Sequence, residues 1–174
     1  MKKLIALTIL CFAVFGLTAC SEPKEPKPSE IPNPIVVVDS ASALADMGLP
    51  IDAPAGASDV VYSTINEQSA QVEYVLDGKH FTFRCSQVLD SKSLHGIYDE
   101  LTLNDLTQDL TGKKGTAHVE TYTIVPSGSA LATTDVKLSA DAKEPISLTL
   151  TCSQVVTSEE IMAYMISLTN ALLD

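Results

Sequence analysis

The sequence predicts an α+β domain, with an antiparallel sheet of about six strands, a short N-terminal helix and a C-terminal helix packed on one face. Apolar and polar residues alternate on both sides of Asp77-Gly78, the pattern of a hairpin with a two-residue type I′ turn. Other segments alternate in the same way, and an apolar stripe at helical spacing follows a capping box near the end of the chain. A run of strands followed by a helix is typical of an α+β fold.

The first residues have the features of a bacterial lipoprotein signal peptide. Lys2 and Lys3 precede an apolar run over residues 4–17, about 14 residues, which suits a signal h-region and is shorter than a spanning helix of about 20 residues. The run ends in Leu17-Thr18-Ala19-Cys20, which matches the lipobox, so we expect cleavage after residue 19 and a lipid on Cys20. An uncleaved anchor and an ordinary signal peptide are the alternatives.

Charge limits the partners that the chain can bind. The formal net charge is −11, and removal of residues 1–19 takes away Lys2 and Lys3, which leaves −13. Nucleic acid needs lysines and arginines to neutralise its phosphates, and anionic lipid headgroups attract basic segments. We therefore expect no nucleic-acid partner. Attachment to the outer face of the cell membrane, or to the outer membrane in a Gram-negative cell, depends on the lipid of Cys20.

The segment after the lipidated cysteine is expected to be a tether. Residues 20–34 contain five prolines among Glu, Lys and Ser, a composition that builds no core and favours extended polyproline II. At about 3.1 Å per residue, this spacer reaches up to roughly 40 Å. The alternative is a proline-rich ligand for an aromatic groove. Residues 35–174 are then expected to form one domain.

Helix signals mark both ends of this domain. Ser40 or Asp39 can cap a short helix that continues to Met47, with Gly48 as its stop and Pro50 just beyond. At the C-terminal end, Thr157 is the expected N-cap of a capping box with Glu160 at N3. One helical stripe follows and should cover the apolar face of the sheet; it consists of Ile161, Met165, Leu168 and Leu172.

The two-residue turn fixes the register of the hairpin. It pairs Leu76 with Lys79, Tyr74 with Phe81, Val72 with Phe83 and Ala70 with Cys85, which makes one face apolar. The other face is expected to meet solvent and carries Gln71, Glu73, His80, Thr82 and Arg84. Glu73 and Arg84 are diagonal neighbours on this face, so they are our candidate residues for capture of a partner.

Further strands are predicted by alternation between turn signals. They cover Val60–Ile65, Thr116–Val125, Ala130–Leu138 and Ile146–Cys152. Cys85 and Cys152 each open a Cys-Ser-Gln-Val sequence at the end of an alternating strand, and both are expected to point inward. Because the domain is expected outside the cytoplasm, a Cys85–Cys152 disulfide is the leading interpretation, and two buried free thiols are the alternative.

The sequence contains no recognisable catalytic motif. His80, His95 and His118 are scattered and lack the spacing of a zinc pair, so we expect no metal and no cofactor. The acidic segment from Asp99 to Asp109 lacks the ordered alternation and glycine of a calcium loop. Two functions remain open: a non-catalytic module that binds an envelope protein or ligand, and an envelope hydrolase whose site is assembled across strands.

Part of the chain resembles a known family. The order Ile31-Pro32-Asn33-Pro34-Ile35, Tyr62-Ser63, Asp77-Gly78-Lys79, Phe81-Thr82-Phe83-Arg84 and His95-Gly96-Ile97-Tyr98 is similar to uncharacterised extracytoplasmic lipoproteins of Gram-positive Firmicutes. The resemblance covers roughly half of the mature chain. It implies an α+β domain on the outer leaflet of a Gram-positive membrane, without an assigned activity. The cysteines at 85 and 152 depart from that pattern.

Overall fold

The computed structural model describes residues 35–125, 127–138 and 145–174. The expected signal peptide, residues 1–19, and the expected tether with Cys20, residues 20–34, lie outside the described residues. The described part belongs to one compact unit, Asn33–Asp174.

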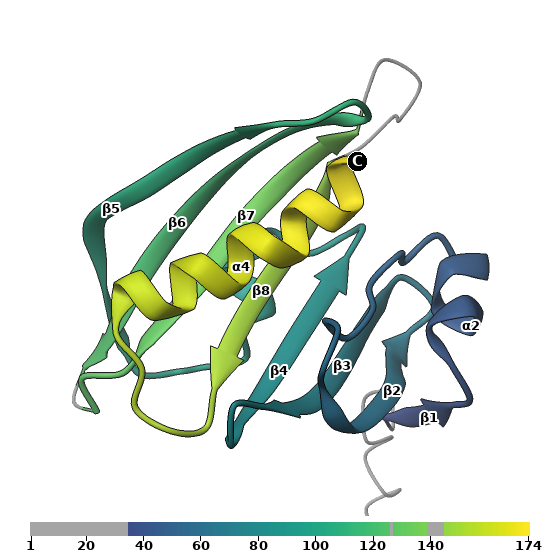
Figure 1. The fold of residues 1–174 in the computed structure, drawn as a ribbon, viewed down its shortest axis with the longest axis horizontal. Coiled ribbons are helices and arrows are strands. Elements are labelled where there is room, and N and C mark those ends of the chain that lie inside the picture. Colours follow the sequence, from purple (N-terminus) through teal and green to yellow (C-terminus); the bar gives the residue numbers. More distant parts are fainter. Residues whose placement is uncertain (1–34, 126, 139–144) are drawn as a thin grey trace, which may run out of the picture. The chain divides into compact units, whose positions relative to one another are not determined.

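Eight strands form a single antiparallel sheet, which confirms the α+β class and corrects the expected number of about six. In chain order they are β1 (Val36–Val38), β2 (Ser58–Asn66), β3 (Ser69–Leu76), β4 (Lys79–Ser86), β5 (Glu100–Thr111), β6 (Gly115–Val125), β7 (Ala130–Leu138) and β8 (Ile146–Cys152). Across the sheet the order is β1-β2-β3-β4-β8-β7-β6-β5. The sheet therefore consists of two four-stranded meanders that meet where β4 pairs with β8 (Figure 1).

The two strands that the sequence did not predict are the edges of the sheet. β1 is only three residues long, and β5 contains most of the acidic segment between Asp99 and Asp109. The pairing of β5 with β6 shifts between Leu103 and Thr107, and this irregularity interrupts the alternation on which a strand prediction depends. Carboxylates on β5 suit an edge strand, because charged side chains discourage further strand pairing.

The hairpin has the predicted register at every pair, from Leu76 opposite Lys79 to Ala70 opposite Cys85. Its turn places Asp77 at φ 52° and Gly78 at φ 75°, as a type I′ turn requires. This turn uses the left-handed region, which glycine adopts without steric cost and aspartate tolerates.

The predicted disulfide is wrong: Cys85 and Cys152 are both free thiols. Both lie on the core face as expected, yet Cys85 is opposite Leu148 and Cys152 is opposite Phe81. The two cysteines are therefore four residues apart along neighbouring strands, or about 13 Å at 3.3 Å per residue. A disulfide needs Cα atoms within about 7 Å, so the register forbids this bond.

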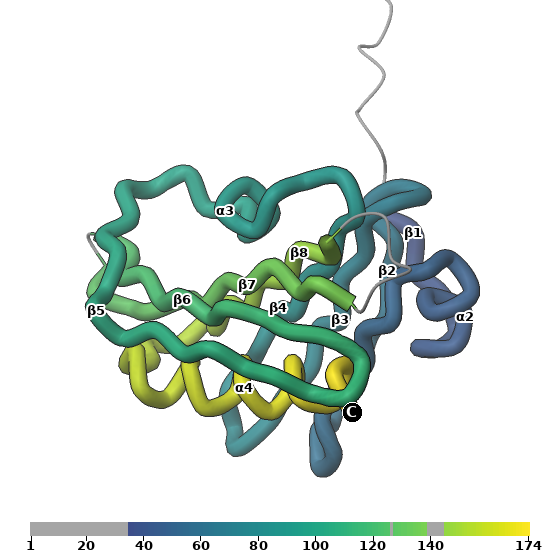
Figure 2. The backbone as a smooth tube through the Cα atoms, turned by 90° about the horizontal axis from the view of Figure 1, so that it is seen from above, coloured from purple at the N-terminus to yellow at the C-terminus, as the bar shows by residue number. Residues whose placement is uncertain are grey.

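The helices lie on opposite faces of the sheet. α4 (Ser158–Leu173) crosses the face formed by β5 to β8, and the loop after α2 (Ala41–Asp46) buries Leu49 and Ile51 in the same core (Figure 1). The short α3 (Ser91–Leu94) lies on the other face, as Figure 2 shows. A smaller hydrophobic cluster, formed by Tyr122, Ile124 and Leu131, lies on the same face of the sheet as α3.

The helix caps agree with the sequence in position. Ser40 is the N-cap of α2, and Gly48 follows the helix with φ 79°. The Thr157 side chain accepts a hydrogen bond from the Glu160 N–H at 3.2 Å, as in a capping box. The Glu160 carboxylate, however, pairs with Lys79 of the hairpin. This contact joins the start of α4 to the first meander.

Candidate functional site

Two adjoining cavities lie beside α4 on the core face of the sheet. Their volumes are about 540 and 390 Å³, and they share Pro50, Ala171 and Leu172 as lining residues. We call the pair the helix groove. A volume of this size is typical of sites for small molecules, and apolar lining is typical as well.

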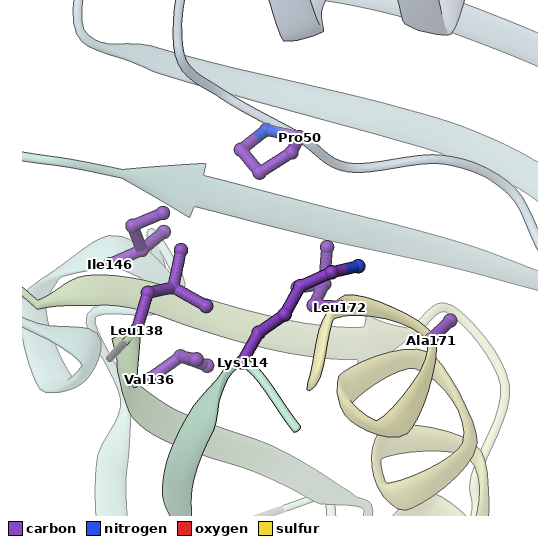
Figure 3. A pocket seen from close by; sticks show the side chains of 7 residues that line it. All are labelled: Pro50, Lys114, Val136, Leu138, Ile146, Ala171 and Leu172. Carbon is purple, nitrogen blue, oxygen red and sulfur yellow. The ribbon is translucent and has the colours of Figure 1, made fainter. Parts of the chain in front are cut away.

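The larger cavity is formed by residues far apart in the sequence. Val136 and Leu138 come from β7 and Ile146 from β8, where alternation places even-numbered residues on the core face. Pro50 comes from the loop after α2, and Lys114 comes from the turn between β5 and β6. Figure 3 shows these side chains around the cavity, with Pro50 across from the strand residues and the long side chain of Lys114 extending between Leu138 and Leu172.

The β5–β6 turn is held against the end of α4. The Lys114 N–H donates a hydrogen bond to the Leu173 carbonyl at 2.9 Å. Gly112 makes this approach possible, because a Cβ at this position would lie 2.5 Å from the Leu173 Cβ. A backbone hydrogen bond thus holds Lys114 beside the groove. The side-chain ammonium group takes no part in that bond.

The smaller cavity extends the groove along the loop over residues 50–55. Phe83 of β4 and Leu168 of α4 add apolar surface, and Asp52 and Ser167 are the polar residues of its lining. The Asp52 carboxylate accepts hydrogen bonds from the Tyr62 hydroxyl at 2.6 Å and from the Ala53 N–H at 2.7 Å. Burial and this carboxylate raise the pKa of Tyr62. Asp52 therefore fixes the loop that forms one wall.

Arg84, one of the two predicted binding residues, is not a free surface side chain. Its Nη1 donates to the carbonyls of Leu94 at 3.3 Å and His95 at 2.6 Å, and its Nε donates to Gln71 at 3.1 Å. Burial lowers the pKa of Arg84. Alternation correctly assigned Arg84 to the face away from α4, but the loop after α3 covers it there. Glu73 remains exposed.

A second polar cluster lies on the same face at the β5–β6–β7 end. His118 Nδ1 is 2.6 Å from an Asp109 carboxylate oxygen, and His118 is directly opposite Asp135 on β7. Asp135 accepts hydrogen bonds from the hydroxyls of Ser147 at 2.6 Å and Ser91 at 3.2 Å. No sequence motif indicates this cluster, because its members come from separate strands and β5 was not predicted.

The other histidines and both cysteines show little sign of chemistry. His80 is exposed, and His95 is buried with its Nδ1 accepting from the Ile97 N–H at 2.9 Å. Burial lowers the pKa of His95. Burial also raises the pKa of the Cys85 thiol to about 12 and raises that of Cys152, which disfavours the nucleophilic thiolate.

Over residues 35–125, 127–138 and 145–174, no three His, Cys, Asp or Glu side chains are placed to hold a metal ion together. None of the helices in that part of the chain is long and apolar enough to cross a membrane. No protein-family model, curated protein or solved structure matches this chain.

Proposed function

We propose that the chain is a surface lipoprotein, anchored by lipid on Cys20, whose domain binds an apolar ligand in the helix groove and performs no chemistry on it. The lipobox at Leu17-Thr18-Ala19-Cys20 supports the anchor, and the resemblance to extracytoplasmic Gram-positive lipoproteins agrees with it. The groove supports the binding role.

The helix groove is the observation that carries this proposal. Its larger cavity has a volume of about 540 Å³, and the walls of the groove come from the loop after α2, the β5–β6 turn, three strands and α4. Sites for small molecules are usually preformed, apolar and bordered by a few polar groups. The groove has these properties, with Lys114 and Asp52 as its charged residues.

The described titratable groups favour binding over catalysis. Catalysis needs a nucleophile and a base that converge on one point. The His118 imidazole is paired with the Asp109 carboxylate. The hydroxyls of Ser91 and Ser147 donate to the Asp135 carboxylate and not to this imidazole. The helix groove itself contains no histidine or cysteine among its lining residues.

A groove-filling substitution tests the proposal. The chain contains no tryptophan, and Ala171 is an exposed residue of α4 that lines both cavities. Ala171→Trp should reduce binding of an environment-sensitive apolar dye about tenfold, a loss of about 1.4 kcal/mol. The measurement uses the whole chain in lipid nanodiscs, with empty nanodiscs as reference.

Ala163→Trp is the matched control, since Ala163 is an exposed residue of the same helix that does not line either cavity. This variant should bind the dye as the original chain does. Equal dye binding by all three proteins would place the dye elsewhere and contradict the proposal.

An envelope hydrolase is the second candidate, and the contact between His118 and Asp109 favours it. A carboxylate that orients a histidine is a common part of hydrolytic sites. The cavity beside this pair measures about 280 Å³. Under this alternative, the purified chain hydrolyses an ester or amide substrate, and His118→Ala abolishes the activity while circular dichroism stays unchanged. Loss of that activity on His80→Ala instead would exclude the His118 cluster.

A further inference from the structure

The charges at the two ends of the helix groove indicate what kind of ligand it takes. The described residues hold six lysines and arginines in a chain of net charge −11. Lys79 pairs with Glu160, Lys92 pairs with Glu120, and Arg84 donates to two backbone carbonyls. These three cations are engaged within the protein.

The remaining three lysines differ in their surroundings. Lys137 lies on the face away from α4, in a cavity that it shares with Asp109 and Asp135. Lys113 and Lys114 are exposed in the β5–β6 turn, and neither forms an ion pair with a described residue. Two cations that form no ion pair with a described acidic residue therefore lie at one end of the groove, and Lys114 lines it.

The end of α4 does not account for these charges. Lysines near a helix C-terminus can bind its last carbonyls. Here the Leu173 carbonyl accepts from the Lys114 backbone N–H, and the Asn170 carbonyl accepts from the Asp174 N–H. Neither bond uses a lysine side chain, and no described residue accepts a hydrogen bond from the Lys114 ammonium.

The walls of the groove specify the rest of the ligand. Between its ends the lining is mainly aliphatic, and Phe83 is the single aromatic residue among the lining residues of both cavities. Recognition of a flat ring or a sugar would call for aromatic faces or several hydrogen-bonding side chains. An aliphatic chain needs neither. At the far end, the Asp52 carboxylate disfavours a second negative charge.

We propose that the helix groove binds a single-chain aliphatic anion, such as a long-chain carboxylate, with its head at Lys114 and its chain along Pro50, Ala171 and Leu172 toward Phe83. This inference rests on the proposed binding function and adds the chemical class of the ligand. The head group forms a charge-assisted contact with the Lys114 ammonium, while the chain buries its methylene groups against α4 and β7. The proposed ligand is a free amphiphile and not a bilayer lipid, because a net charge of −11 disfavours close approach to anionic headgroups.

Photo-crosslinking of the whole chain in its native membrane tests the inference. Three probes share one saturated chain with a diazirine and differ in the head, which is a carboxylate, an alcohol or an amine. The carboxylate probe should label residues 136–138 or 167–172 most strongly. Lys114→Glu should lower that labelling about tenfold, or about 1.4 kcal/mol, and should increase labelling by the amine.

Lys92→Glu is the matched control, since it makes the same change in net charge on the face away from α4. It should leave labelling by the carboxylate unchanged. Lys114→Gln provides a milder second variant, for which we expect an intermediate loss. A diacyl phospholipid probe should label only at background.

The contrary results are distinguishable. Equal labelling by the three single-chain probes, unaffected by Lys114→Glu, would overturn the anionic head while the binding function stands. Strong labelling by the phospholipid probe would identify a bilayer lipid and overturn the inference. Absence of labelling in the groove by every probe would overturn both the inference and the proposed function.

Discussion

The guanidinium of Arg84 donates a hydrogen bond to the His95 carbonyl at 2.6 Å and so connects the central strand β4 to the loop after α3. Gly96 follows with φ 69°, in the left-handed region that favours glycine, and a Cβ there would clash with Arg84 Nη1. Glycine thus lets the loop approach the guanidinium without moving it. Arg84 acts as a structural residue that holds a covering segment in place.

Substitution of Arg84 should therefore destabilise the domain. Arg84→Met keeps most of the aliphatic stem but removes the hydrogen bonds to Leu94, His95 and Gln71. We expect a loss of about 1.5 to 3 kcal/mol in the free energy of unfolding, because the donor is charged and half-buried. The shift in the urea midpoint measures it. Glu73→Gln on the same face should change stability by less than about 0.5 kcal/mol, and a larger effect there would mean that Glu73 is not a plain surface residue.

The two free thiols should react at different rates. Cys85 is fully buried, whereas Cys152 is partly exposed at the end of β8. Alkylation of the native chain without reductant, followed by peptide mapping, should label Cys152 first and Cys85 only after unfolding. Both should be labelled in denaturant. Failure of either to react in denaturant without reductant would indicate a disulfide and contradict the register of β4 and β8.

Stability should fall at high pH because of Cys85. Its folded pKa is about 12, while an unfolded thiol titrates near 9, so between these values the unfolded chain has lost a proton that the folded chain retains. The contribution of the buried Cys85 thiol to the free energy of unfolding is complete below pH 9. It is lost as the pH rises toward 12, at up to about 1.4 kcal/mol per pH unit. Cys85→Ala should flatten this decline, measured as the slope of unfolding free energy against pH. An unchanged slope in this variant would show that other groups cause the decline.

The proposed lipid anchor can be tested in cells. Cys20→Ala should abolish incorporation of a labelled fatty acid into the chain and leave the precursor unprocessed, because the proposed lipid is attached to that cysteine. Cys11→Ala, which changes a cysteine within the expected signal peptide, is the control and should leave labelling intact. Acylated Cys20→Ala protein would refute the assignment.

Local features could be predicted from the sequence, and contacts between distant segments could not. Asp77-Gly78 determined the hairpin register because a two-residue turn leaves one way to pair its strands. Thr157 likewise identified the start of α4. Alternation placed Cys85 and Cys152 on one face, but it carries no information about how far one strand slides along another, and the disulfide prediction failed for this reason.

The helix groove is a similar case. Pro50, Lys114, Ile146 and Ala171 meet only because four separate segments pack together, and each residue taken alone is an ordinary core or surface residue. Arg84 shows the same limit on the opposite face, since the period of a strand says which side a residue is on but not whether a loop covers that side.

The seam between β4 and β8 also affects how the chain folds. Within each meander, neighbouring strands are also consecutive in the chain, and the longest connection, over residues 39–57, joins β1 to β2. The residues paired across the seam are instead 61 to 71 positions apart. Closing such a loop costs chain entropy before any contact rewards it. We expect the two halves to gain structure early and the seam to limit the rate of folding. On the proposed secretory route, β4 leaves the channel well before β8, so the seam cannot pair until β8 has followed.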